Sequence, residues 1–199
     1  MVSFASENTS LMEELASHGY TVISVQHREQ LEEFKALGRS QATAEKTAAA
    51  DLARQISVAD AAGKAALAAA YYEASGNTNR IVRERAADTS CVLDRVCEVM
   101  AAIPGRPASL PGTEAAHLVG FSVGGAVSTE VAMRDARVLS VTNLDGGTYG
   151  TIDVRSLARP CLMMYSQGNA GMNDLLLPDQ ARRLVAEGTR HLNFHDVAH

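Results

Sequence analysis

Apolar residues near the start of the chain follow two different periods. In residues 6–18, Leu11, Met12 and Leu15 recur at helical spacing and predict an amphipathic helix. The run from Tyr20 to Val25 is apolar and rich in β-branched side chains, which is typical of a buried parallel strand. The sequence therefore predicts a helix followed by a strand.

The middle of the chain has helical composition. Residues 43–74 are rich in alanine with scattered charges, and we expect a helix here that is interrupted near Gly63. After a loop at 75–79, a second helix is expected over 80–102. Its predicted inner face consists of apolar residues: Ile81, Ala86, Val92, Leu93, Val96 and Met100.

The last part of the chain alternates between the two periods. Strands are predicted at 116–119, 138–144 and 161–166, and helices at about 123–134 and 178–187. Strands that alternate with helices indicate a parallel sheet with right-handed crossovers. The predicted class is α/β, with a mostly parallel sheet flanked by helices.

One motif in this part predicts chemistry. Ser122 is the centre of a Gly-x-Ser-x-Gly sequence formed with Gly120 and Gly124, and Gly125 follows. Between a strand and a helix this motif forms a sharp turn that exposes a nucleophilic serine. The turn requires a positive φ at the serine and glycines where the strand and helix pass closely. It also directs the backbone amide of Val123 toward the negative charge that develops on a substrate oxygen.

A serine nucleophile needs an acid that orients its base. In α/β-hydrolases the chain order is serine, then acid, then histidine, each at the carboxyl end of a strand. Asp145 directly follows the predicted strand 138–144 and precedes two glycines, so it is the favoured acid. Asp153 and Asp174 are alternatives, the latter because it follows the next strand.

The base has to come later in the chain than the acid. Three histidines meet this condition: His191, His195 and His199. His191 follows a turn after the last predicted helix, which is the loop position that the fold requires, and it is the favoured base. Because zinc needs a third protein ligand beside the pair of His195 and His199, we expect no metal and no cofactor.

Several segments together resemble one family, the platelet-activating-factor acetylhydrolase-like branch of the α/β-hydrolases, which are serine esterases and lipases. The resemblance covers most of the chain. The matching segments are Leu15 to Tyr20, Val25 to Arg28, Arg83 to Asp94, the elbow Gly120 to Gly125, Leu144-Asp145-Gly146, and Gly188 to Asp196. The last of these is similar to a Gly-x-x-His-x-Asn-Phe-x-Asp signature and selects His191.

The resemblance implies an activity and a set of roles. It implies cofactor-free hydrolysis of short-chain carboxylic esters, including the sn-2 acyl group of platelet-activating-factor-like or oxidised phospholipids. Ser122 is the implied nucleophile, His191 the base and Asp145 the acid. The expected partner is therefore a small ester or a phospholipid, with peripheral lipid contact at most.

The resemblance also predicts an incomplete domain. Residues 1–199 would be a single partial α/β-hydrolase domain with an Ala-rich helical insertion at about 41–102, lacking the first strands and a helix after His199. The second oxyanion donor of the family aligns near Met1, and a chain terminus frays too easily to hold an amide in place. An alternative function follows, in which a catalytically impaired fragment acts as a binding module through its exposed sheet edge.

Charge and composition exclude other classes of protein. The net charge of −5 gives no electrostatic reason to expect nucleic acid. No apolar run approaches the roughly 18 residues that would span a bilayer. The Ala-rich block 41–74 lacks bulky apolar residues, so we favour a packed crossover over a lid that meets lipid.

Overall fold

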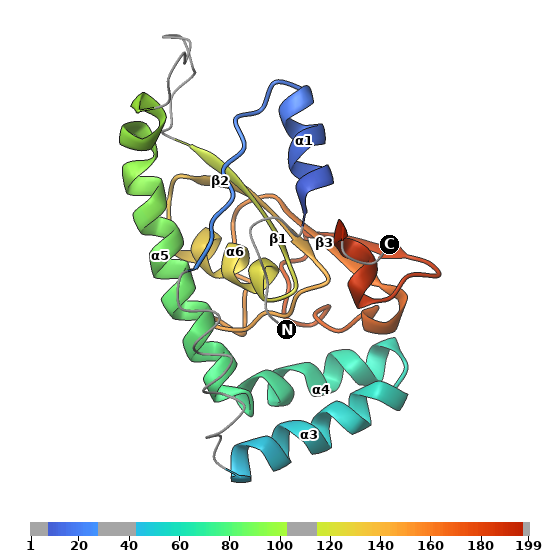
Figure 1. The fold of residues 1–199 in the computed structure, drawn as a ribbon. Helices are drawn as coiled ribbons and strands as arrows, with labels where there is room; N and C mark the ends of the chain where they lie inside the picture. The colour runs from blue at the N-terminus through green and yellow to red at the C-terminus, as the bar shows by residue number, and fades with distance from the viewer. Residues whose placement is uncertain (1–7, 28–42, 103–114, 197–199) are drawn as a thin grey trace.

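The computed structural model describes residues 8–27, 43–102 and 115–196. Its centre is a four-stranded sheet in the order β1-β2-β3-β4, in which every neighbouring pair is parallel. The strands are β1 (Ala116–Phe121), β2 (Val138–Leu144), β3 (Cys161–Ser166) and β4 (Arg182–Ala186). Because the strands are parallel, their carboxyl ends meet at one edge of the sheet (Figure 1).

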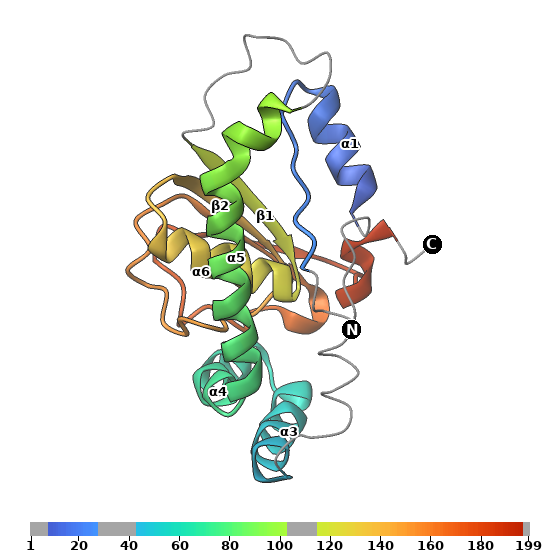
Figure 2. The same cartoon turned by 60° about the vertical axis from the view of Figure 1, so that its left-hand side comes forward.

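Two helices cover one face of this sheet. Helix α6 (Val123–Arg134) contacts β1 and β2, and α5 (Gly76–Ala101) packs against α6. Figure 2 shows α5 and α6 on the same side of the strands. Between these layers lie side chains with almost no exposed surface, among them Val82, Val131, Val141 and Met163. This core is the largest apolar contribution to the fold's stability.

The Ala-rich segment forms a pair of helices, α3 (Thr43–Val58) and α4 (Ala61–Glu73). The interruption lies at residues 59–60 and not near Gly63, because Asp60 caps α4 by accepting a hydrogen bond from the Gly63 amide at 2.8 Å. Helix α4 buries Ala65, Ala68 and Tyr72 against the core. The next helix begins at Gly76, so the expected loop at 75–79 is much shorter.

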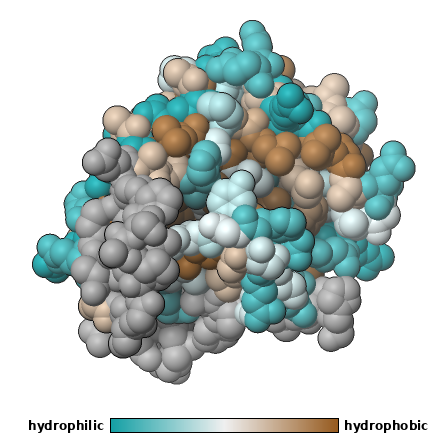
Figure 3. Space-filling view, turned by 90° about the horizontal axis from the view of Figure 1, so that it is seen from above, coloured by the Kyte–Doolittle hydropathy of each residue, from teal (hydrophilic) through white to brown (hydrophobic). Residues whose placement is uncertain are grey.

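The other face of the sheet is more open. Helix α1 (Thr9–Ser17) lies on this side (Figure 2), and its stripe of Leu11, Met12 and Leu15 is only half-buried. Val119 and Leu184, which point to this face, are 44% and 50% exposed. Figure 3, seen from above, shows brown hydrophobic residues at the surface between polar ones. The two faces of the sheet are therefore covered unequally.

Two predicted elements are wrong. Residues 20–27 form no strand, and Tyr20 and Ile23 are largely exposed. Their β-rich sequence cannot form a strand without a partner, and β1 pairs only with β2 within the described part of the chain. The helix expected over 178–187 is instead a turn followed by β4, because pairing with β3 outweighs the weak local preference of this short segment.

The predicted fold class is confirmed. The sheet is parallel, helices flank it, and the chain turns sharply at Ser122 between β1 and α6. Helix α6 and strands β2 and β3 have the predicted bounds, and β1 extends two residues further, to Phe121. These features define an α/β-hydrolase-like fold.

Candidate active site

Ser122 is the N-cap of α6, and its backbone has φ 54° and ψ −120°. This left-handed conformation is uncommon for a residue with a side chain and lifts the hydroxyl out of the sheet. A Cβ on Gly120 would lie 2.1 Å from the Gly124 carbonyl oxygen, so only glycine fits there. A Cβ on Gly124 would meet nothing within 4 Å, whereas one on Gly125 would lie 2.1 Å from Asn143 Oδ1. The second close approach therefore belongs to Gly125 and not to Gly124.

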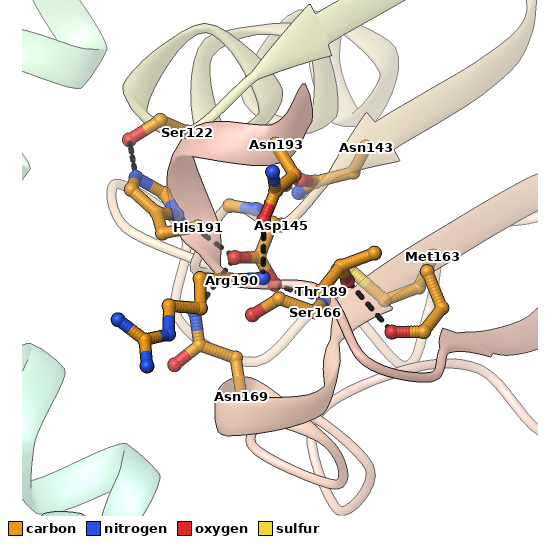
Figure 4. A network of polar contacts seen from close by, with 12 residues as sticks. Ser122, Asn143, Asp145, Met163, Ser166, Asn169, Thr189, Arg190, His191 and Asn193 are labelled. Atoms are coloured by element: carbon orange, nitrogen blue, oxygen red, sulfur yellow. Dashed lines mark hydrogen bonds and ion pairs between the residues drawn. The ribbon is translucent and has the colours of Figure 1, made fainter. Parts of the chain in front are cut away.

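Three side chains that the sequence singled out form one hydrogen-bonded chain (Figure 4). Ser122 Oγ lies 2.9 Å from His191 Nε2, and His191 Nδ1 lies 2.8 Å from Asp145 Oδ2. The three residues are separated by up to 69 positions in the sequence and come from loops at the carboxyl edge of the sheet. The three side chains lie together because the carboxyl ends of parallel strands share that edge.

Asp145 is the most tightly held member of the group. Its backbone also has a positive φ of 56°, and its side chain has no exposed surface. Oδ1 accepts a hydrogen bond from the Ser166 amide at 2.6 Å, and Oδ2 accepts a second one from Asn169 at 2.9 Å. Burial raises the pKa of Asp145, but the hydrogen bonds from His191 and Ser166 outweigh it and leave the pKa below its usual value.

The charge of Asp145 assigns the tautomer of His191. An ionised carboxylate can only accept hydrogen bonds, so Nδ1 of the imidazole donates to Asp145. Nε2 then has a free lone pair directed at the Ser122 hydroxyl. This is the arrangement in which a histidine can take a proton from serine.

His191 is the first residue of a short 3₁₀ helix, η2 (His191–Phe194). The Arg190 amide donates to Asn193 Oδ1 at 2.8 Å and fixes the first turn. The ring of Phe121, at the end of β1, lies 4.8 Å from the His191 ring and 5.3 Å from that of His195. The segment is also tied to α1, where the Ser10 amide donates to Asp196 at 2.8 Å.

The alternative acids have other partners. Asp153 pairs with Arg155, and Asp174 accepts from Tyr165 and pairs with Arg183. His195 contacts Phe121, whereas the second alternative base, His199, lies outside the described residues.

One candidate oxyanion donor, the Val123 amide, lies at the start of α6. Val123, the first residue of α6, lines the cavity beside Ser122, and the first amides of a helix have no acceptor within it. Met1, the other predicted donor, lies outside the described residues.

The parts of the chain that the structure describes contain no group of three or more metal-ligating side chains. They also contain no helix with the length and apolar character that a bilayer crossing requires.

A cavity of about 320 Å³ opens at Ser122 and His191. Four tyrosines from separate parts of the chain contribute to its wall: Tyr71, Tyr72, Tyr149 and Tyr165. Burial raises the pKa of Tyr72, Tyr149 and Tyr165, so their hydroxyl groups stay protonated at neutral pH. The cavity is the space in which a substrate would reach the serine.

Sequence reasoning missed several residues around the site. Ser166 ends β3 and Asn169 follows it, next to the strand that directly precedes Asp145, so the strand-end rule could have found both residues. Tyr71 and Tyr72 end α4 and enter the site only through the packing of that helix. Nothing in the local sequence marks those two tyrosines as part of a cavity.

Comparison with known proteins adds one likeness. No family model matches the chain, and no curated protein matches it either. A solved structure that resembles it is a ferulic acid esterase from Streptomyces cinnamoneus, with 29% sequence identity and a TM-score of 0.47. The match covers 60% of this chain and 36% of the esterase, so the chain spans about a third of that enzyme's length.

Proposed function

We propose that this protein is a serine hydrolase that cleaves carboxylic esters through an acyl-enzyme. The observation that carries the proposal is the chain of two hydrogen bonds, 2.9 and 2.8 Å long, from Ser122 through His191 to Asp145. The positive φ of Ser122 at the start of α6 supports it, because this turn exposes the hydroxyl to the cavity.

The mechanism has two halves. In the first, Ser122 Oγ attacks the ester carbonyl carbon while His191 Nε2 takes the hydroxyl proton. The tetrahedral intermediate collapses, the bond to the alcohol oxygen breaks, and His191 returns its proton to the departing alcohol. In the second half, a water molecule gives a proton to His191 and attacks the acyl-serine, and the carboxylic acid leaves as Ser122 recovers its hydrogen.

Asp145 and Val123 act on charge in this scheme. The Asp145 carboxylate holds the imidazole in the tautomer that accepts the serine proton and stabilises the imidazolium that forms. The Val123 amide stabilises the negative oxygen of the intermediate from the positive end of α6. The family resemblance alone suggests a second oxyanion donor, a backbone amide near Met1.

The proposed substrates are esters with short acyl groups. The family resemblance adds the sn-2 acyl group of platelet-activating-factor-like phospholipids as one specific candidate. A series of p-nitrophenyl esters from acetate to decanoate, followed by such a phospholipid, would rank these substrates by kcat/KM.

The test of the chemistry is covalent labelling. A fluorophosphonate probe reacts with an activated serine, so we expect stoichiometric labelling that maps to Ser122. Ser122→Ala abolishes labelling, and His191→Ala lowers the rate of labelling by at least 10³-fold because the base is lost. Ser128→Ala is a matched control, since Ser128 is a buried serine of the same helix and is not expected to react.

The second candidate is a non-catalytic binding module. One observation favours it: within the described residues, β1 is an unpaired edge of the sheet. A folded protein that neither reacts with the probe nor hydrolyses esters would overturn the hydrolase proposal and leave this second candidate.

A further inference from the structure

The cavity beside Ser122 has an aromatic wall built from three rings that touch one another. Tyr71 and Tyr72 come from α4, and Tyr149 comes from the loop that follows Asp145. The ring centroids of Tyr72 and Tyr149 are 4.6 Å apart, those of Tyr71 and Tyr72 are 5.5 Å apart, and those of Tyr71 and Tyr149 are 6.3 Å apart. All three pairs are inclined, from tilted to edge-to-face.

The Tyr72 ring, which contacts the other two, is fixed in place at its polar end. The Tyr72 hydroxyl donates to Asn173 Oδ1 at 2.5 Å, and Asn173 in turn donates to the Gly146 carbonyl at 3.0 Å. Gly146 directly follows Asp145, so the position of the rings is linked to the loop that holds the proposed acid. A preorganised wall loses little conformational freedom when a ligand binds.

The spacing of the rings and the charges around them limit the classes of ligand that the cavity can bind. Aromatic cages for quaternary ammonium groups surround the cation, whereas these rings contact each other and leave no gap between them. Among the described residues that line the cavity, none is a lysine or arginine that could bind a phosphate. The only carboxylate in the lining, Asp145, is already bonded to His191.

We propose that the site selects esters that contain a planar aromatic ring close to the ester carbonyl, with Tyr71 and Tyr149 as specificity-determining residues. This inference rests on the proposed function, since it names the substrate class of the same site. A flat ring can lie against the tyrosines in offset or edge-to-face geometry, and a puckered aliphatic ring of similar size cannot. The expected preference is about three- to tenfold.

The experiment compares matched esters on the wild-type protein. The first pair is methyl phenylpropanoate and methyl cyclohexylpropanoate, which place the ring on the acyl side. The second pair, phenylethyl and cyclohexylethyl acetate, places it on the alcohol side. A kcat/KM ratio of three or more in either pair supports the proposal and identifies the side. Ratios near one in both pairs overturn it.

A third pair tests the competing cation. Acetylcholine and its neutral isostere dimethylbutyl acetate differ only in the charge of the bulky group. We expect a ratio near one. A preference for the cation larger than the aromatic preference would overturn the proposal in favour of an ammonium site.

Variants connect the preference to the wall. Tyr71→Leu and Tyr149→Leu lower the phenyl-to-cyclohexyl ratio toward one, and Tyr71→Phe retains it because the ring remains. Both tyrosines are half-buried, so the leucine variants are expected to fold, which circular dichroism would check. Tyr20→Leu, which removes a tyrosine that is 60% exposed and lies outside the cavity lining, is the matched control. An unchanged ratio in both leucine variants would overturn the assignment.

A binding measurement separates this inference from the proposed function. In Ser122→Ala no acyl-enzyme can form, so binding of the phenyl and cyclohexyl esters is compared directly by competition in saturation-transfer NMR. Tighter binding of the phenyl ester supports the wall even if the wild-type protein proves unreactive toward the fluorophosphonate. Equal binding, or failure of both esters to bind, overturns it even in an active esterase.

Discussion

Asp145 receives hydrogen bonds from three residues in two segments, the end of β3 with the turn that follows it and the η2 segment. Its two oxygens accept from the Ser166 amide, the Asn169 amide group and the His191 ring. Asn169 and His191 share Oδ2, so each limits where the other can lie. Asn169 is therefore a positioning residue for the imidazole.

We predict that Asn169→Ala lowers kcat about five- to tenfold and leaves KM nearly unchanged. A typical intramolecular hydrogen bond contributes about 0.5–1.5 kcal/mol, and the loss of this one acts on the histidine rather than on the substrate. Asn169→Asp lowers kcat further because it places a second carboxylate against Asp145. Steady-state kinetics on a short-chain ester measures both. Equal kcat in all three proteins would show that Asn169 does not position the imidazole.

At the scale of elements, helix α6 lies so close to strand β2 that one position of the helix has room only for glycine. Gly125 faces Asn143 of β2, whose side chain is fully buried and donates to Thr129 while it accepts from the Gly146 amide. The neighbouring Gly124 faces open space. These two adjacent positions therefore provide a matched pair.

We predict that Gly125→Ala destabilises the protein by about 2–3 kcal/mol, because its methyl group must displace Asn143 from its hydrogen bonds. Gly124→Ala is expected to be neutral or to stabilise α6 by up to about 1 kcal/mol through helix propensity. Urea denaturation monitored by circular dichroism gives both free energies of unfolding. Similar losses in the two variants would contradict the close approach of α6 to β2.

The connection from α6 to β2 has its own electrostatic clamp. Asp135 caps the end of α6 and accepts from the Arg137 backbone amide at 3.0 Å and from its guanidinium group at 2.9 and 2.6 Å. Arg137 also pairs with Asp94 of α5 at 2.8 Å. The hydrogen bond from the Arg137 side chain lowers the pKa of Asp135 to about 2.

This shift predicts a pH-dependent contribution to stability. Because the folded pKa is lower than the unfolded one, the contribution is complete above about pH 4 and disappears as the pH falls through about 2. With solvent screening at the partly exposed guanidinium, Asp135→Asn is expected to cost about 1 kcal/mol at neutral pH. The gap in unfolding free energy between wild type and variant should close in acid. A gap that stays constant from pH 7 to pH 2 would refute the clamp.

The elements that sequence patterns predicted well are those with a clear period and a packed neighbour. Helix α6 and strands β2 and β3 have alternating or continuous apolar residues that the core requires. Strand β4 is short and half-exposed, so only its pairing with β3 defines it, and that pairing is not local information. The strand predicted at residues 20–25 is absent for the opposite reason: its sequence is strand-like, but no strand in the described part of the chain pairs with it.

At the scale of the whole molecule, the two faces of the sheet differ in burial. Val141 points toward α6 and is 1% exposed, whereas Val119, which points to the other face, is 44% exposed. Strand β1 has apolar residues on both faces, Leu118 on one and Val119 on the other, so its sequence pattern cannot reveal this difference. It arises from the number of helices that the described chain places on each side.

We predict that Val119→Thr and Leu184→Thr change the free energy of unfolding by less than about 0.5 kcal/mol each, because water already reaches both side chains. Val141→Thr is the buried counterpart and should cost about 1–3 kcal/mol, since its hydroxyl has no water to replace its hydrogen bonds. Denaturant titrations of the three variants measure these values. A large loss at Val119 would mean that this face is covered in solution.

How much of the site could be predicted also depends on scale. Ser122, Asp145 and His191 were accessible from the sequence because chain order and the positions of strand ends constrain them. The tyrosine wall was not accessible, because Tyr71 and Tyr149 are 78 positions apart and meet only after α4 docks onto the core.

The segment that holds His191 is fastened at its far side to the first turn of α1, where Asp196 accepts hydrogen bonds from Ser10 and Thr9, so that two ends of the described chain meet there. Mild heating that breaks the hydrogen bonding to Asp196 would move the imidazole away from Ser122 while the parallel strands remain folded. Catalysis should then disappear at a lower temperature than the ellipticity of the protein does, so that the molecule passes through a well-folded but silent form.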